Sequence, residues 1–260
     1  MAETIYGLDY YTGKDEGWSA MAAAIVPAML RWFPASSVVE FGCGTGASLA
    51  AFAAHGATDV LGVDGAHVPQ HLLHVPAARF QAADLLTLAD VGRRFDVSVS
   101  LEFAEHLPLS RAAGFVDLLV RAAPVVLFSA AIPGQGGLGH VNEQRQSWWA
   151  ALFARHGYVP VDCIRPAMWG LADAPWYYAQ NALVYCLPEY VPAGLRPVTV
   201  PLYLDLVDDR VYDTLINPPD SISGSVAAMR RHGAALTRAV TRRLRGRGAA
   251  SPDALRHAAE

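Results

Sequence analysis

The sequence predicts an α/β fold with a mostly parallel seven-stranded sheet and helices on both faces. Strand-like and helix-like stretches alternate from residue 37 to about residue 187, and such alternation is typical of a parallel sheet flanked by helices. A glycine-rich turn follows the first apolar strand, in "VVEFGCGTGA". The chain is also long enough to bury a large core, because its 260 residues are 53% hydrophobic and 17% charged.

The expected strands are short runs of apolar and β-branched residues bounded by turn residues. They cover residues 37–41, 59–64, 78–84, 95–102, 124–133, 158–164 and 176–187. The segment before the last strand, "RPAMWGLADAP", carries no convincing helical pattern. We therefore expect the last two strands to pair as a hairpin, which makes the last strand antiparallel.

Helices are expected where apolar residues recur at helical spacing. They cover residues 46–56, 110–123 and 146–157. A helical N-terminal cap is expected over residues 1–34, as part of a domain that spans residues 1–190. Residues 191–260 are expected to form a C-terminal extension with a basic helix.

Composition narrows the class of protein and its partners. The net charge of −4 predicts no general affinity for nucleic acid. No run approaches the ~20 uninterrupted apolar residues of a membrane span, and the N-terminus lacks the basic region of a signal peptide. A cytoplasmic protein with no membrane partner is therefore expected, with a homodimer as a possible assembly. The arginine-rich stretch 229–247 is more typical of a solvated helix than of a docking surface.

The glycine turn allows two readings. Gly42, Gly44 and Ala47 match the dinucleotide pattern, in which a helix N-terminus binds a pyrophosphate. Glu40 argues against this reading, because a carboxylate at the turn repels a diphosphate and attracts a cation. The second reading uses Gly42, Gly44 and Gly46, with Glu40 two residues before the first glycine. It predicts a ligand without a phosphate that carries a positive charge.

With "VVEFGCGTG", the chain resembles the class I, Rossmann-like, S-adenosylmethionine-dependent methyltransferases. The resemblance covers about residues 36–187 and implies S-adenosylmethionine as the cofactor. It implies that Glu40 pairs with the ammonium group of the cofactor and that Asp64 accepts hydrogen bonds from both ribose hydroxyls. The other residues that it places at the cofactor are Tyr11 in the cap, Gly42, Gly44 and Gly46 in the turn, Asp84 and Leu85 at the adenine, and Glu102 at a strand end. The alternatives are that Asp64 is only a turn residue and that Asp84 only caps the helix after it.

Candidate catalytic residues follow the fourth and fifth strands, where ligands bind in this architecture. The segment after the fifth strand, "PGQGGLGHVNEQ", is rich in glycine and ends in polar residues. His140 is the first candidate for a general base, because an unperturbed imidazole titrates near neutral pH. His106 is the second, although it is more typical of a residue that lines the cofactor pocket. No metal site is expected.

The residues expected to bind the acceptor come from the same loop and from two tryptophans near the last strand. They are Asn142, Glu143, Gln144, Trp169 and Trp176; Asn142 also reads as a cap of the helix that follows it. The predicted function is methylation of a small molecule, on oxygen by preference, in a bacterial sugar or natural-product pathway. Two alternatives stay open: another use of S-adenosylmethionine, such as cyclisation or aminocarboxypropyl transfer, or a non-catalytic subunit that binds it.

Overall fold

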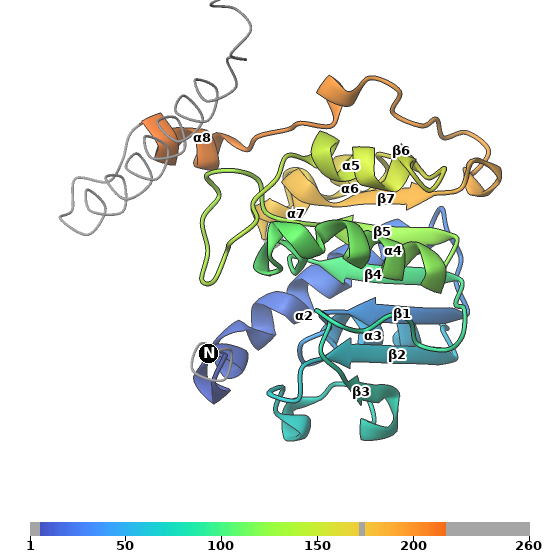
Figure 1. The fold of residues 1–260 in the computed structure, drawn as a ribbon, viewed down its shortest axis with the longest axis vertical. Coiled ribbons are helices and arrows are strands. Elements are labelled where there is room, and N and C mark those ends of the chain that lie inside the picture. Colours follow the sequence, from blue (N-terminus) through green and yellow to red (C-terminus); the bar gives the residue numbers. More distant parts are fainter. Residues whose placement is uncertain (1–5, 172–174, 217–260) are drawn as a thin grey trace, which may run out of the picture. The chain divides into compact units, whose positions relative to one another are not determined.

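The structure is a computed structural model that describes residues 6–171 and 175–216. Seven strands form one sheet in the order β3-β2-β1-β4-β5-β7-β6 (Figure 1). They are β1 (Ser37–Phe41), β2 (Asp59–Asp64), β3 (Phe80–Ala82), β4 (Val97–Leu101), β5 (Val125–Ser129), β6 (Val159–Val161) and β7 (Leu183–Cys186). Neighbours pair in parallel except for β7, which is antiparallel to both β5 and β6. The predicted fold class and the antiparallel last strand are confirmed.

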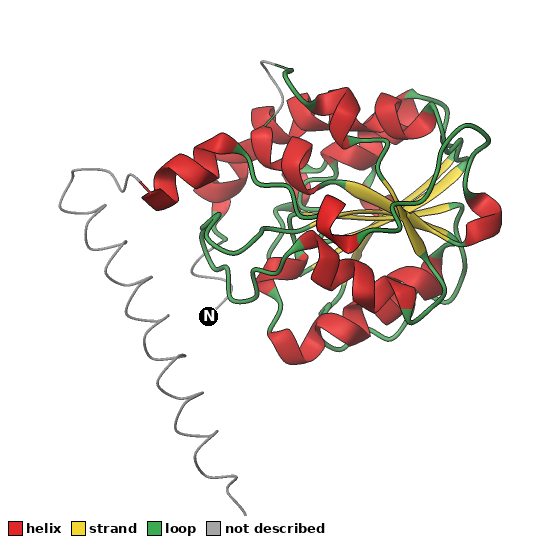
Figure 2. Ribbon diagram, turned by 90° about the horizontal axis from the view of Figure 1, so that it is seen from above, coloured by secondary structure: helices red, strands yellow, loops and turns green. Residues whose placement is uncertain are grey.

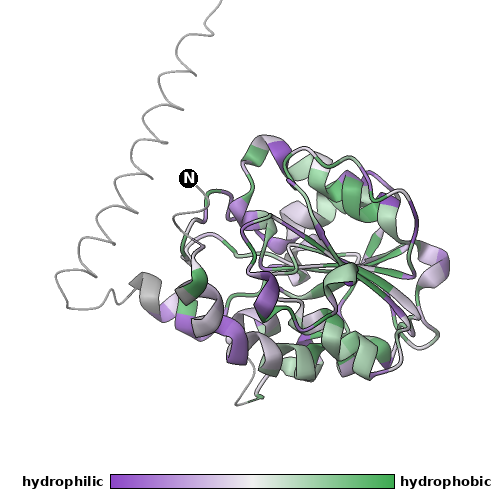
Figure 3. Ribbon diagram, turned by 90° about the horizontal axis from the view of Figure 1, so that it is seen from below, coloured by the Kyte–Doolittle hydropathy of each residue, from purple (hydrophilic) through white to green (hydrophobic). Residues whose placement is uncertain are grey.

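Helices cover both faces of the sheet (Figure 2). They are α2 (Leu8–Leu30), α3 (Ala47–Ala54), α4 (Ala112–Ala122), α5 (Gln146–Ala154), α6 (Arg165–Met168) and α7 (Trp176–Asn181). Helix α8 (Asp209–Ile216) follows them in the chain and belongs to a second compact unit. Successive strand residues face opposite sides, so Val38 belongs to the apolar cluster under α2 and α3, and Val39 to the cluster under α4 and α5. Hydrophobic residues accordingly concentrate along the central strands (Figure 3).

The segment between the last two strands corrects the sequence prediction. The stretch 176–187 was expected to be one strand, but Trp176–Asn181 is helix α7 and only Leu183–Cys186 is strand β7. A second short helix, α6, precedes it. The expected pairing of the last two strands is present, with Val159 opposite Cys186, although helices join them instead of a hairpin turn. Aromatic residues favour strands on average, but six residues are too few for periodicity to decide, and tertiary packing overrides the propensity.

The chain divides into two compact units, residues 1–208 and residues 209–260. The C-terminal extension expected from residue 191 thus starts with a segment that packs within the first unit, where Val198 N donates a hydrogen bond to Pro160 O at 2.8 Å. The expected basic helix at 229–247 lies outside the described residues. No helix in the described part of the chain is long and apolar enough to cross a membrane.

A buried arginine anchors that segment. Arg165 is 1% exposed and makes a bidentate pair with Asp162, with Nε to Oδ1 at 3.0 Å and Nη2 to Oδ2 at 2.7 Å. Its Nη1 donates to Leu204 O at 2.7 Å. One guanidinium therefore connects α6 to the chain that follows β7.

Replacing Arg165 with alanine is expected to lower the free energy of unfolding by about 3 kcal/mol. The change leaves the Asp162 carboxylate and the buried carbonyl of Leu204 without their hydrogen-bond donor. Urea denaturation measures the change. Arg121→Ala is the control, since Arg121 lies 3.9 Å from Asp117 in an exposed pair and such pairs contribute less than ~1 kcal/mol. Equal losses in the two variants would contradict an anchoring role for Arg165.

Candidate active site

The glycine turn lies at the carboxyl end of β1, and its backbone requires glycine at three positions. Gly42, Gly44 and Gly46 have φ angles of +76°, +51° and +81°, in the left-handed region that favours glycine. A Cβ on Gly42 would also lie 2.3 Å from Cγ of Phe103, which is too close for any side chain. The turn leads directly into α3, whose N-cap is Gly46.

Asp64 ends β2, the strand beside β1, and its carboxylate holds the turn. Its Oδ2 accepts a hydrogen bond from Gly44 N at 2.8 Å, and its Oδ1 accepts one from Gly65 N at 2.6 Å. Burial raises the pKa of Asp64, although the two N–H groups partly offset the effect. The parallel pairing of β1 and β2 brings this acid to the glycine turn.

Glu40 is buried beneath the same turn, with a side chain that lacks a cationic partner among the described residues. It is 3% exposed, and its Oε2 has no hydrogen-bond partner in the described structure. Burial raises its pKa to about 8, while a hydrogen bond with Ser48 lowers it and the charge of Asp64 raises it further. A buried carboxylate in this state is stabilised by a cation at the turn, as the sequence predicts.

The N-terminal helix closes over the turn. Thr45 Oγ1 donates to Asp15 Oδ1 at 3.1 Å, and His74 Nε2 lies 2.8 Å from the same oxygen. A Cβ on Gly44 would lie 3.7 Å from Trp18 and 4.0 Å from Tyr11, so these two rings cover Gly44. Tyr11, expected at the cofactor, is therefore beside the turn.

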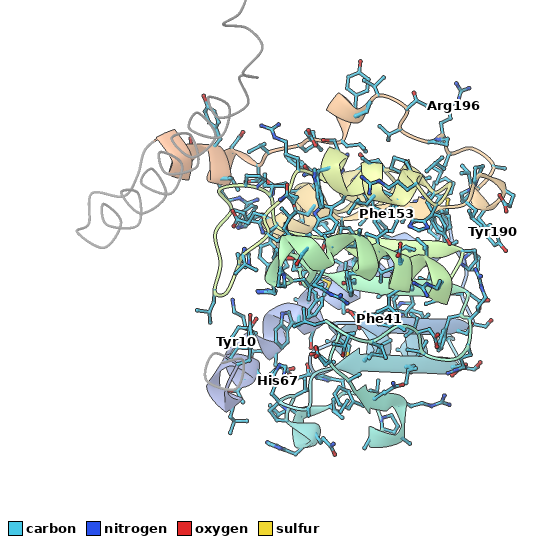
Figure 4. The ribbon with its side chains drawn as sticks, in the orientation of Figure 1. Tyr10, Phe41, His67, Phe153, Tyr190 and Arg196 are labelled. Carbon is cyan, nitrogen blue, oxygen red and sulfur yellow. The ribbon has the colours of Figure 1, made fainter. Side chains whose placement is uncertain are left out.

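Further aromatic rings extend this cover. Figure 4 shows Tyr10 and His67 close together at the carboxyl ends of the strands. Tyr6 lies against both, with ring centroids 5.0 Å from Tyr10 and 5.8 Å from His67. The expected cap over residues 1–34 thus contains α2 and, in its described part, an aromatic cluster above the turn.

The two residues expected at the adenine, Asp84 and Leu85, lie after β3 in a turn. Asp84 is exposed, and its Oδ1 accepts a hydrogen bond from Leu86 N at 2.9 Å. Leu85 between them is buried. The carboxylate thus closes a local turn, and its role toward adenine stays a prediction.

Glu102 departs from the expected geometry of a strand end. It is the one non-glycine residue with positive φ, +49°, in the described part of the chain, a strained conformation typical of functional sites. Its carboxylate accepts hydrogen bonds from Gln135 Nε2 at 3.0 Å and Asn181 Nδ2 at 3.1 Å. Burial raises its pKa despite these donors. These bonds connect Glu102 to the loop after β5 and to α7.

Gln135, Gln180 and Asn181 are site residues that sequence reasoning missed. Gln180 Nε2 donates to Gln135 Oε1 at 3.1 Å and to Asn181 Oδ1 at 2.8 Å. Gln180 and Asn181 lie in α7, within a stretch that the sequence predicts to be a strand. The polar pair in an otherwise aromatic stretch, "WYYAQN", was the available signal.

Two histidines and a glutamate meet beside this network. His140 Nε2 lies 3.8 Å from Glu105 Oε1, and the rings of His106 and His140 are edge to face with centroids 4.9 Å apart. Tyr6 Oη lies 3.0 Å from His106 Nδ1. Burial, and then the charge of His140, lower the pKa of His106 to about 4. The structure thus brings together both candidate catalytic residues, with Glu105 beside them.

Glu105 is the most isolated acid of the site. It is fully buried, and neither carboxylate oxygen has a hydrogen-bond partner of normal geometry among the described residues. Burial, and then the charge of Glu102, raise its pKa well above the usual range, although backbone N–H groups nearby oppose the shift. Its own carbonyl accepts bonds from Val141 N at 2.9 Å and Asn142 N at 3.0 Å, which fastens the loop to this residue.

The polar residues of the loop mostly organise the loop itself. Glu143 accepts hydrogen bonds from Gly134 N at 2.9 Å and Gly136 N at 2.8 Å. These bonds and the one from His140 outweigh burial, so the pKa of Glu143 is lowered. Gln144 Nε2 donates to Asn142 Oδ1 at 3.0 Å, while Asn142 Nδ2 is buried with no partner in the described structure. Asn142 therefore retains a free donor.

The two tryptophans expected at the acceptor lie on either side of residues 172–174, which are outside the described part. Trp169 follows α6 and is 51% exposed, and Trp176 opens α7. An acceptor wall formed by them stays a prediction.

Comparison with known proteins identifies the class. Residues 18–162, more than half of the chain, match the family described as a methyltransferase domain. The chain therefore belongs to this family and is a methyltransferase, and the resemblance to S-adenosylmethionine-dependent methyltransferases is confirmed. Curated protein sequences contain no match to the chain.

Solved structures share the fold. S-adenosylmethionine-bound CalS10, an amino pentose methyltransferase from Micromonospora echinaspora, is 18% identical with a TM-score of 0.52, over 68% of this chain and 94% of CalS10. The sugar N-methyltransferase KedS8 from Streptoalloteichus has the same identity and TM-score, over 68% of this chain and 91% of KedS8. An O-methyltransferase family protein from Burkholderia thailandensis is 11% identical with a TM-score of 0.50, over 69% of this chain and 57% of that protein. At these identities the likeness concerns the fold.

Proposed function

We propose that this methyltransferase transfers the methyl group of S-adenosylmethionine to a hydroxyl of a small molecule, in a sugar or natural-product pathway. The observation that carries the cofactor assignment is Glu40, a buried carboxylate under the glycine turn with one oxygen unpartnered in the described structure. The ammonium group of the cofactor supplies a cation, directly or through water. Asp64 then accepts hydrogen bonds from the ribose hydroxyls of the cofactor, and the rings of Tyr11 and Trp18 cover its methionine end.

The pathway class rests on the structural neighbours. CalS10 is involved in calicheamicin biosynthesis, and KedS8 methylates a sugar nitrogen. The fold of the present chain covers 94% of CalS10 and 91% of KedS8, and both of those proteins methylate sugars. We therefore propose a small acceptor for the present chain as well. A cytoplasmic location and a homodimer stay predictions of the sequence.

Oxygen is the acceptor atom that best suits the site, because a hydroxyl must lose its proton and the site contains groups for that step. Methyl transfer releases a neutral thioether, so no general acid is required. Glu105, His106 and His140 converge at the carboxyl ends of β4 and β5, next to Glu102 and its amides. We place proton removal at His140, with the free amide donor of Asn142 to orient the acceptor.

Calorimetry with S-adenosylhomocysteine tests the cofactor assignment. The wild-type chain is expected to bind it and not to bind NAD. Asp64→Ala is expected to weaken binding by ~1.5–3 kcal/mol, about 10- to 150-fold, because two hydrogen bonds to a charged group are lost.

Asp90→Ala is the matched control. Asp90 is exposed, and its Oδ1 accepts a hydrogen bond from Gly92 N in a loop, so its removal is expected to leave affinity unchanged. Circular dichroism checks that both variants fold. Tight NAD binding without a response to S-adenosylhomocysteine would refute the proposed cofactor.

A further inference from the structure

We propose that Glu105, His106 and His140 form a binding site for one divalent first-row transition-metal ion, which binds and acidifies the acceptor hydroxyl. The part that concerns the acceptor rests on the proposed function; the ion site itself does not. The sequence alone predicts no metal site, with His106 more typical of the cofactor pocket and His140 a candidate base in a glycine-rich loop. The structure joins the three.

The geometry of the cluster suits a metal ion. One ligand atom from each of the three residues lies within 4.8 Å of the others. Metal–ligand bonds of about 2.1 Å place ligand atoms about 3.4 Å apart in a tetrahedral site, so binding requires the side chains to close by up to about 1.4 Å. Gly136, Gly137 and Gly139 precede His140 in the loop and give the backbone the conformational range for this shift.

Glu105 supplies the independent observation that points to a cation. It is fully buried, and both of its carboxylate oxygens lack a hydrogen-bond partner of normal geometry among the described residues. Burial of an unpaired carboxylate is costly, and buried charges in proteins are paired or coordinate metals. The nearest basic group is His140 Nε2, at 3.8 Å from Oε1. An ion between these two atoms would partner both.

Each imidazole has an oxygen beside one of its ring nitrogens, as histidine ligands of metals usually do. His140 Nδ1 lies 3.2 Å from Glu143 Oε1, which leaves Nε2 for the side of Glu105. His106 Nδ1 lies 3.0 Å from the Tyr6 hydroxyl. Glu143 is itself fixed by Gly134 N and Gly136 N. The supporting groups thus come from the loop and from the N-terminal cap.

The donor set selects the kind of ion. Imidazole nitrogen suits Zn²⁺, Co²⁺ and Fe²⁺, whereas Mg²⁺ prefers oxygen ligands alone. Three protein ligands leave positions open for a substrate. In the proposed reaction the acceptor oxygen occupies one of them, and its proton leaves to water as the O–metal bond forms. The methyl group then moves from sulfur to oxygen, the S–CH₃ bond breaks as the O–CH₃ bond forms, and S-adenosylhomocysteine leaves as a neutral thioether. With the ion bound, His140 serves as a ligand and the ion acidifies the hydroxyl. His140 takes the proton itself, as described under the proposed function, only when no ion is bound.

Cobalt(II) is the probe, used on the tag-free full chain after chelator treatment. We expect one Co²⁺ per chain, seen as visible d–d absorption, with no thiolate charge-transfer band. X-ray absorption of the wild-type protein is expected to show two imidazole ligands at about 2.1 Å. Neither measurement needs an acceptor or a variant.

Variants locate the site. His106→Ala, His140→Ala and Glu105→Gln are each expected to weaken Co²⁺ binding by about 100-fold or more, and Glu143→Gln by about 10- to 100-fold. His156→Ala is the matched control, because His156 pairs with Asp117 at 2.8 Å on the outside of the molecule, and it is expected to bind as wild type. Circular dichroism checks each fold, and Glu105→Gln keeps the shape of the side chain.

The outcomes separate this inference from the proposed function. Wild-type protein that binds S-adenosylhomocysteine but not Co²⁺ would overturn the metal site and leave the methyltransferase proposal in place. Binding with thiolate bands, or binding that is unchanged in Glu105→Gln and His140→Ala, would also overturn it. Stoichiometric binding that these two variants lose supports it, whether or not the acceptor has been identified.

Discussion

Replacing His140 with alanine is expected to lower the turnover number by ~10²–10⁴-fold, with the affinity for S-adenosylmethionine within about threefold of wild type. Both roles considered for this residue, proton acceptor and metal ligand, require the imidazole. Cofactor affinity is expected to persist, because the backbone N–H groups of Gly44 and Gly65 hold the Asp64 carboxylate in place. The loop that carries His140 contributes neither of these hydrogen bonds. Steady-state kinetics with an acceptor found by a substrate screen measures the loss.

His106→Ala is the informative comparison. If His106 mainly lines the cofactor pocket, its loss will change cofactor affinity at least as much as turnover. If it acts with His140, turnover will fall while affinity holds. Full activity in His140→Ala would contradict both roles of that residue. It would leave His106 as the base, or an acceptor nucleophilic enough that positioning alone carries the reaction.

The arrangement of Glu40, Asp64 and the glycine turn could be predicted from sequence because its determinants are local. Glu40, the glycines and Asp64 occupy fixed positions at the ends of two adjacent parallel strands, so their spacing along the chain translates directly into proximity. All three glycines of the pattern have left-handed φ angles, which glycine adopts far more readily than other residues. The buried, partly unpartnered state of Glu40 follows from the same pattern.

The acceptor half could not be predicted to the same depth. His140 lies 34 residues after His106, and their contact depends on how a glycine-rich loop folds back to place Val141 N and Asn142 N on the carbonyl of Glu105. No periodicity encodes that contact. The amides of Gln180 and Asn181 were missed for a related reason, since their stretch is helical only in its tertiary setting. Tertiary packing decides how such a loop folds back and whether such a short stretch is helical, and the local sequence pattern predicts neither.

Replacing Gly44 with valine is expected to abolish cofactor binding while the fold is retained. Gly44 has φ of +51°, and a β-branched residue in this region costs at least ~1–2 kcal/mol. The change also acts directly on the site, because Gly44 N is the donor that holds Asp64 Oδ2 at 2.8 Å. The methyl groups of valine would extend beyond a Cβ that already lies 3.7 Å from Trp18, and so would push the cap away from the turn.

Gly92→Val is the control for backbone strain. Gly92 has φ of +73°, and a Cβ there would meet nothing within 4 Å, so the variant carries the strain without touching the cofactor site. Calorimetry with S-adenosylhomocysteine is expected to give wild-type affinity for Gly92→Val and no measurable heat for Gly44→Val, with thermal unfolding lowered to a similar extent in both. A folded Gly44→Val protein that binds normally would mean that Gly44 only shapes the loop. The ligand would then not approach the backbone at this turn, and the assignment of Glu40 and Asp64 to the cofactor would have to be given up with it.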